Sequence, residues 1–259
     1  MLKQFFLFLH FSSFFLAALT FLFVKTLVHN ASLSAYPYFL FFAVLGIYGA
    51  HRIFKFHFDK LLSAQMDCLQ RYYILFTMVC VFSLFTSLYY LFQLVAFSDV
   101  IPFILVLTLL TGLYIFPKPT FSLRRIPRIK AFLVAIVWTF LVYYIPIGYE
   151  SSIGMFTAYF CFFLHLSIVS DIKDLDIDSS TLRTMPMEYG IRGSYAFSLL
   201  LVSCFYGVLW CFSFHPMVLC CYAVQLLFLY VFYKQKKENS QFYDYSIGFL
   251  IVLHYLTQI

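Results

Sequence analysis

The residues best suited to chemistry form one acidic cluster, 171–178, in an otherwise apolar chain. Only 11% of the 259 residues are charged, yet this cluster contains four carboxylates. If the helix that enters it continues, a turn of about 100° per residue places Asp171, Asp174 and Asp178 within roughly a 60° arc and leaves Asp176 outside it. Carboxylates on one face repel each other unless a cation lies among them, and Mg²⁺ binds such oxygens while leaving positions for phosphate. The spacing predicts a Mg²⁺-diphosphate site; the alternative is a solvated acidic loop at the end of a membrane helix.

The composition determines what kind of scaffold holds this cluster. The chain is 63% hydrophobic and 23% aromatic, whereas soluble domains are apolar in about half of their residues. We therefore predict an all-α polytopic membrane protein, built as one integral domain over residues 1–259. A need of about 20 apolar residues per span predicts nine helices. They are expected near residues 4–27, 36–58, 72–96, 100–116, 131–149, 152–170, 194–214, 216–233 and 243–259.

Lys and Arg orient these helices. The chain has 17 basic residues, and all but Lys3 and Lys25 lie in or beside the loops after the second, fourth, sixth and eighth predicted helices. The positive-inside rule then places the N-terminus and these four loops in the cytoplasm. We expect the protein to be integral to a bacterial inner membrane, that is, the plasma membrane. The formal charge of +6 is explained by this topology and by anionic membrane lipid, without a nucleic-acid partner.

The acidic cluster and the residues after it carry a family resemblance. The pattern Asp171-x-x-Asp174-x-x-x-Asp178, followed by Thr184-Met185-Pro186-x-x-x-Gly190, resembles the second Asp-rich motif of the UbiA family of intramembrane prenyltransferases. With nine spans, the resemblance covers nearly the whole chain. It implies an all-helical fold that holds Mg²⁺ and the diphosphate of an isoprenoid donor, while a lipid-soluble, often aromatic acceptor attacks the prenyl C1. By this resemblance Asp171, Asp174 and Asp178 are the metal ligands.

The chain departs from the family at the first Asp-rich motif. Residues 51–59, His-Arg-Ile-Phe-Lys-Phe-His-Phe-Asp, stand where that motif is expected, and only its last carboxylate, Asp59, is present. On a helix His51 and Lys55 are neighbours, with Arg52 about 60° further round. These three residues are candidates to bind phosphate directly, because Arg and Lys are both phosphate ligands. The alternative is that they anchor the helix end at the membrane surface.

Further basic residues are candidates for the same role. Lys118 and Lys130 lie in the loop between the fourth and fifth predicted helices, where the family has phosphate-binding residues; they are equally expected as topology determinants. Arg183 and Arg192 flank the tail of the acidic motif and are expected to pair with its carboxylates or with phosphate. His165, about a turn and a half before Asp171, is expected to form an interhelical hydrogen bond rather than to act in catalysis.

Two functions remain open on the sequence. The first is transfer of a prenyl group from a polyprenyl diphosphate to a lipid-soluble acceptor, with Mg²⁺ and the surrounding charge stabilising the leaving diphosphate. The intact second motif and its tail favour this function. The second is a non-catalytic, UbiA-like membrane protein that binds an isoprenoid or lipid, or acts as a scaffold, and the altered first motif favours it.

Overall fold

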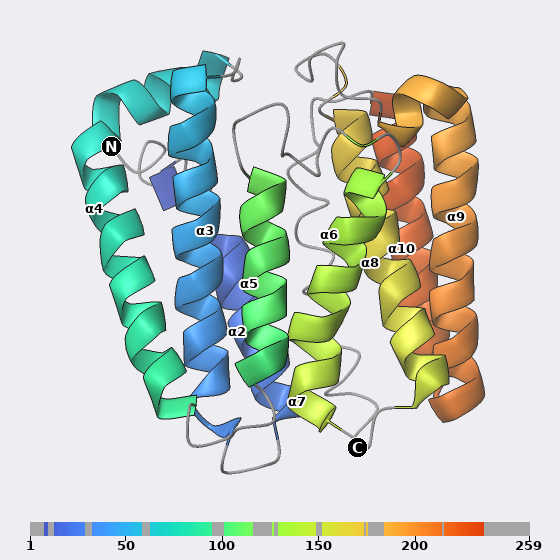
Figure 1. Ribbon diagram of the computed structural model, residues 1–259. Coiled ribbons are helices and arrows are strands. Elements are labelled where there is room, and N and C mark those ends of the chain that lie inside the picture. The colour runs from blue at the N-terminus through green and yellow to red at the C-terminus, as the bar shows by residue number, and fades with distance from the viewer. Residues whose placement is uncertain are drawn as a thin grey trace. The chain divides into compact units, whose positions relative to one another are not determined.

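In the computed structural model the chain is helical, and no strand occurs in the part of the chain that the structure describes (Figure 1). That part comprises residues 8–9, 13–28, 33–58, 63–94, 101–115, 126, 129–148, 152–173, 175, 184–213 and 215–235. Its residues group into two compact units, Met1–Phe103 and Ile104–Ile259. The expectation of a single domain over residues 1–259 stays a prediction.

Six described helices are long and apolar enough to cross a membrane. These spans are Tyr36–His57, Met66–Leu94, Ile129–Ile147, Ile153–Ile172, Met185–Phe212 and Pro216–Lys234. Phe14–Leu27 and Ile101–Leu113 are apolar but shorter, and the predicted ninth span at 243–259 lies outside the described residues. The chain is thus an integral membrane protein by the length and composition of its helices.

The first unit is built on a close pair of helices, α3 (Tyr36–Phe58) and α4 (Ser63–Leu94), with α2 (Phe14–Leu27) packed on α3. The two helices approach at Gly46, where a Cβ would lie 2.8 Å from Leu84 Cδ2. At the same point the Cys80 thiol donates a hydrogen bond of 3.2 Å to the Gly46 carbonyl. Small residues allow such approaches between membrane helices, where dispersion contacts replace the hydrophobic effect as the driving force.

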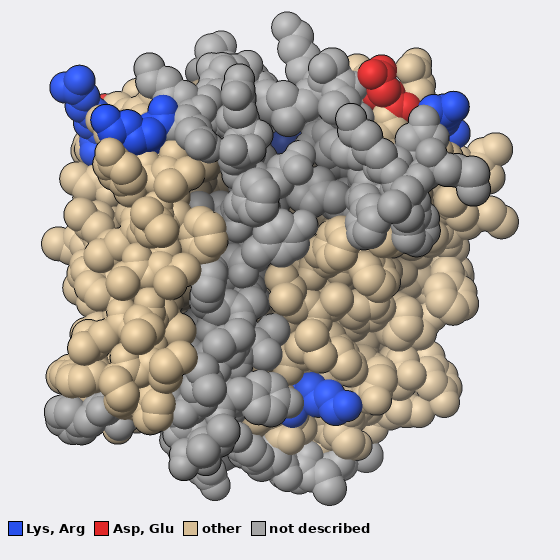
Figure 2. All heavy atoms as spheres, turned by 180° about the vertical axis from the view of Figure 1, so that it is seen from behind, with Lys and Arg blue, Asp and Glu red and all other residues tan. Residues whose placement is uncertain are grey.

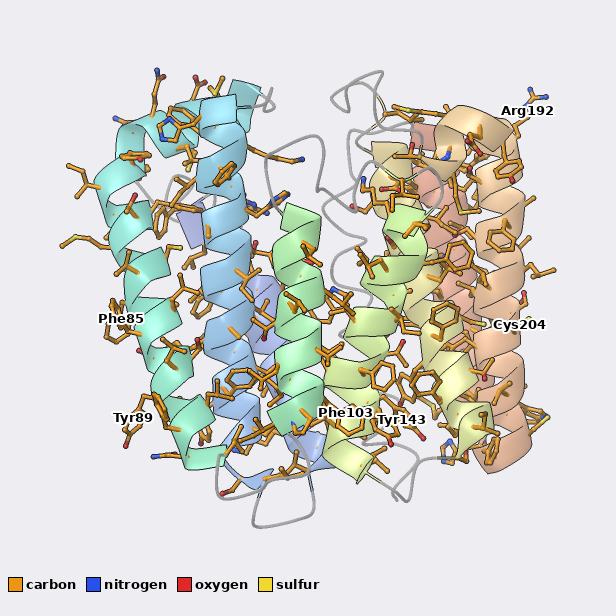
Figure 3. The ribbon with its side chains drawn as sticks, in the orientation of Figure 1. Phe85, Tyr89, Phe103, Tyr143, Arg192 and Cys204 are labelled. Carbon is orange, nitrogen blue, oxygen red and sulfur yellow. The ribbon has the colours of Figure 1, made fainter. Side chains whose placement is uncertain are left out.

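The outer flank of α4 shows what this unit presents to its surroundings. Phe85, Tyr89 and Phe92 are strongly exposed, and Figure 3 shows Phe85 and Tyr89 pointing away from the helix pair. Most of the described surface in Figure 2 carries neither Lys, Arg, Asp nor Glu. An exposed apolar flank of this kind fits the hydrocarbon layer of a membrane.

The second unit contains α6 (Ile129–Thr139), η3 (Phe140–Tyr144), α7 (Ile145–Ile147), α8 (Ile153–Lys173), α9 (Met185–Ser213) and α10 (Pro216–Gln235). The segment α6–η3–α7 forms one span, widened to a π-helix at η3. Pro146 has no N–H and its ring conflicts with the carbonyl four residues earlier, so the preceding residue Ile145 bonds instead to Phe140, five residues back, at the widened turn.

Helix starts in this unit follow local capping. Ser152 precedes α8, and its hydroxyl accepts a hydrogen bond from the Met155 N–H at 3.2 Å. His215 precedes α10, where its Nδ1 accepts from the Met217 N–H at 3.3 Å and Pro216 takes the first helical position. The sequence breaks expected at these two points are confirmed.

Two predicted helix starts were wrong. The spans expected to begin at residues 72 and 194 belong to helices that begin at Ser63 and Met185. Each helix changes direction inside, at Tyr72 in α4 and at Gly190 in α9, where the backbone is not helical. A hydropathy pattern detects only the apolar part, because a polar helical turn at the membrane surface looks like a loop in sequence.

Candidate functional site

The candidate site lies at one end of the second unit and is centred on an ion pair. We call this the basic end; it comprises the start of α6, the end of α8, the start of α9 and the end of α10. Lys130, the second residue of α6, places its Nζ 2.5 Å from Oδ1 of Asp171, which lies two residues before the end of α8. The Lys130 side chain is 10% exposed and that of Asp171 2%. Two of the residues singled out in the sequence, Lys130 as a candidate phosphate ligand and Asp171 as a candidate metal ligand, therefore meet.

Helix electrostatics argue against stability as the reason for this pair. The N-terminus of a helix carries a partial positive charge and the C-terminus a partial negative charge. Lys130 lies at the N-terminus of α6 and Asp171 near the C-terminus of α8, so each charge faces a helix end of its own sign. Each placement costs about 0.3–1 kcal/mol at a helix terminus, in addition to the desolvation of both ions. Charged groups retained at such a cost in a membrane bundle are good candidates for function.

Only one of the three predicted metal ligands lies among the described residues. The helical register on which their common face depends is observed as far as Lys173, and Leu175 lies in a turn. Asp174 and Asp178 lie outside the described residues. Among the described residues no three His, Cys, Asp or Glu side chains come together as a metal-binding group. The carboxylate of Asp171 is a suitable oxygen ligand for Mg²⁺, but in this structure it is engaged by an ammonium group.

The remaining basic candidates are distributed differently. Lys118 and Arg183 lie outside the described residues. Arg192 is exposed and points away from the bundle (Figure 3), so it does not pair with Asp171. His51, Arg52 and Lys55 are half-buried near the end of α3 in the first unit.

The tail of the acidic motif, residues 184–190, forms the start of α9 and the residue before it. Thr184 is buried directly before the helix, and its carbonyl accepts the Met187 and Glu188 N–H groups at 3.1 and 3.3 Å. Gly190 then adopts φ 71° and ψ 166°, a conformation that is essentially restricted to glycine. The glycine thus redirects the chain between the first residues of α9 and the rest of the helix.

Two hydroxyl groups, one just before α9 and one within it, are buried in this unit. Thr184 Oγ1 and Ser194 Oγ are buried and have no hydrogen bond within the part of the chain that the structure describes. A helical serine ordinarily bonds to the carbonyl four residues before it, which for Ser194 is that of Gly190, where the helix is broken. Buried hydroxyls without partners are uncommon and costly.

Deeper in the unit, a polar node joins three helices. His165 of α8 hydrogen-bonds through Nδ1 to the hydroxyl of Ser198 of α9, and its Nε2 lies 3.4 Å from Gln225 Nε2 of α10. All three side chains are fully buried. With the amide donating to Nε2, the imidazole is neutral and carries its proton on Nδ1. The predicted interhelical hydrogen bond of His165 is confirmed; Ser198 and Gln225 were missed, although both stand out as polar residues within apolar runs.

Aromatic side chains fill the unit beyond this node. Tyr143 of η3 stacks on Tyr159 of α8 with ring centroids 4.4 Å apart, and Tyr159 contacts Phe205 of α9 at 5.7 Å. Phe205 in turn lies 4.8 Å from Phe162. Figure 3 shows Tyr143 at the end of its span away from the basic end. The interior is thus polar at the basic end and aromatic beyond the node.

Comparison of the chain with family models, curated proteins and solved structures gave no match.

Proposed function

We propose that this protein is a diverged member of the UbiA family that transfers a prenyl group from a polyprenyl diphosphate to a lipid-soluble acceptor. The observation that carries the proposal is the buried Lys130–Asp171 pair. It brings an acidic residue of the motif beside a basic residue at the start of α6, and a diphosphate with a divalent cation needs groups of both signs. The aromatic interior of the same unit suits an isoprenoid chain and offers ring faces to an allylic cation.

The chemistry assigns distinct tasks to the residues. Lys130 offers a charge-assisted hydrogen bond to a phosphate oxygen, and Asp171, with Asp174 and Asp178, offers carboxylate oxygens to Mg²⁺. When bound, Mg²⁺ supplies positive charge that stabilises the departing diphosphate. Burial of the pair strengthens these interactions, because the local dielectric is low.

The proposal includes a topology. We infer nine spans, six of them the long helices and two the shorter apolar helices, with the ninth at 243–259. The N-terminus and the basic end face the cytoplasm, and the C-terminus faces outward. The donor diphosphate would then be bound from the cytoplasmic side.

The test is a transfer assay on purified full-length protein with labelled prenyl diphosphates, Mg²⁺ and a pool of lipid-soluble acceptors. We expect Asp171→Asn and Asp174→Asn to abolish transfer and Asp176→Asn to reduce it much less, because only the first two share the proposed metal face. Equal losses at all three positions would show that general charge in the cluster, and not a shared face, is responsible. Absence of transfer from every donor would reject the enzymatic function.

The second candidate function is that of a non-catalytic member that binds an isoprenoid or lipid, or acts as a scaffold. It is favoured by His51, Arg52 and Lys55, which stand where the family has acidic metal ligands. If these three side chains bind phosphate directly, which we call the basic wall, Arg52→Gln with Lys55→Gln should weaken diphosphate binding about ten- to a hundredfold in correctly inserted protein. Unchanged affinity would discard the basic wall and favour the non-catalytic function, which lipid identification on the purified protein would then test.

A further inference from the structure

The ion pair of Lys130 and Asp171 imposes a condition on any ligand of this site. A divalent cation that approaches Asp171 meets the ammonium of Lys130, whose Nζ is 2.5 Å from Oδ1. If the cation takes the carboxylate alone, the buried ammonium of Lys130 loses the carboxylate that it contacts, which is unfavourable. If an anion binds Lys130 alone, the buried carboxylate of Asp171 in turn loses the ammonium that it contacts. Neither ligand is therefore accommodated well without the other.

The two buried hydroxyls are a second, independent indication of a ligand at this end. Thr184 Oγ1 and Ser194 Oγ are buried without a hydrogen-bond partner among the described residues. Thr184 directly precedes α9 and Ser194 lies within it, and α9 packs along α8. A hydroxyl can donate to a phosphate oxygen or accept from a metal-bound water. This unit thus combines a buried cation, a buried anion and two hydroxyls that have no hydrogen-bond partner among the described residues.

We propose that Lys130 is an internal counter-ion of Asp171 that changes partner when a phosphate-bearing ligand and a divalent cation bind together. Without ligand, Lys130 neutralises Asp171. With both ligands, Lys130 contacts a phosphate oxygen and Asp171 contacts the cation, so every buried charge keeps an opposite charge beside it. This inference rests on the proposed function for the identity of the site, but it adds how the two ligands depend on each other: they bind with positive coupling.

The exchange is tested by equilibrium dialysis of the full-length protein with Mn²⁺ and labelled pyrophosphate, alone and together, with the Mn²⁺–pyrophosphate complex included in the free concentrations. In the unmodified protein, we expect each ligand to raise the affinity of the other by about tenfold or more. Independent binding, with no mutual effect, would overturn the proposal. The assay contains neither prenyl group nor acceptor, so its result is separate from that of the transfer assay.

Variants of Lys130 give effects of opposite sign for the two ligands. Lys130→Gln should bind Mn²⁺ alone about tenfold more tightly, because the competing ammonium is gone, and pyrophosphate about tenfold more weakly. Lys234→Gln removes an exposed lysine in the last turn of α10, also at the basic end, and should change neither affinity. If Lys130→Gln binds Mn²⁺ no more tightly than the unmodified protein does, Lys130 does not compete for Asp171 and the proposal fails.

A charge-retaining variant covers the case in which Lys130→Gln does not fold. Lys130→Arg keeps the ion pair, but a guanidinium grips a carboxylate through two parallel hydrogen bonds. We expect it to release Asp171 less readily, so that the coupling between Mn²⁺ and pyrophosphate falls severalfold; coupling equal to that of the unmodified protein would contradict the exchange.

Phosphatidic acid in mixed micelles, offered in place of pyrophosphate, identifies the source of the phosphate. If Mn²⁺ binding is coupled to phosphatidic acid but not to pyrophosphate, the exchange is supported and the phosphate belongs to a lipid headgroup.

Discussion

Lys130 and Asp171 form a buried ion pair in which each charge lies at the helix terminus of its own sign. The two residues come from antiparallel helices that meet at the basic end, so reversing the pair would satisfy both helix dipoles. An ion pair selected for stability would be expected in the reversed order. The observed order is what a site needs if the carboxylate binds a cation and the ammonium binds an anion.

The first prediction concerns the stability of this pair. Lys130→Gln should lower the free energy of unfolding by about 3–5 kcal/mol, because the buried carboxylate of Asp171 loses the ammonium that it contacts. Lys130→Gln with Asp171→Asn should recover most of that loss. Reversible unfolding in mixed detergent micelles measures both variants, with Lys234→Gln as the exposed control. A double variant less stable than Lys130→Gln would show that the two charges are not coupled.

The second prediction separates function from stability at the same two positions. Exchanging the residues, Lys130→Asp with Asp171→Lys, keeps opposite charges and places each at its favourable helix end. We expect this variant to be more stable than Lys130→Gln in the same unfolding measurement. It should nevertheless lose coupled binding of Mn²⁺ and pyrophosphate, because cation and anion sites have changed places. Retained coupling would mean that any opposite charges at these positions suffice.

The third prediction concerns the direction change in α9. Gly190→Ala should destabilise the protein by about 1–3 kcal/mol, because φ 71° with ψ 166° is strained for any residue with a Cβ. The space around the glycine is open, so a steric clash cannot account for the effect. Gly207→Ala, in the helical part of α9 with open space around it, is the matched control and should be neutral or stabilising by up to about 1 kcal/mol. Equal effects at both glycines would remove the conformational explanation.

The fourth prediction concerns the packing of α3 on α4. Gly46→Ala places a methyl group 2.8 Å from Leu84 Cδ2 and 3.2 Å from the Leu84 backbone nitrogen. The side chain can rotate but the backbone cannot, so we expect a loss of about 1–3 kcal/mol from overpacking. Leu84→Ala in the same variant should recover part of the loss. If Gly46→Ala unfolds at the same detergent composition as the unmodified protein, the helices are not in close contact there.

The fifth prediction concerns the polar node of His165, Ser198 and Gln225. His165→Leu and Ser198→Ala should each cost about 1–2 kcal/mol, the scale of hydrogen bonds between membrane helices. Their double variant should cost less than the sum, because both remove the same hydrogen bond. A double-mutant cycle in mixed micelles measures this coupling. Strict additivity would show that the node contributes no pairwise hydrogen-bond energy.

Much of the fold could be predicted because membrane insertion depends on local composition. A run of about 20 apolar residues identifies a span wherever it stands in the chain, and the helix predicted near 36–58 has these bounds in the structure, where it is α3. Capping residues such as Ser152 also act within one helical turn, so helix starts of this kind are visible in sequence. The starts of α4 and α9 were not visible in the sequence, because their first helical turns are polar and do not belong to an apolar run.

The pairing of Lys130 with Asp171 was decided only by the tertiary structure. The sequence identified both residues as candidates, since a carboxylate cluster and a basic loop stand out in an apolar chain. It could not show that the two would meet, because α6 and α8 become neighbours only through the packing of the whole unit. For the same reason His165 was predicted to bond to another helix, while its partners Ser198 and Gln225 followed from the rotation and height of α9 and α10. Local composition determines which segments enter the membrane, and packing determines which of their polar groups must share a buried space.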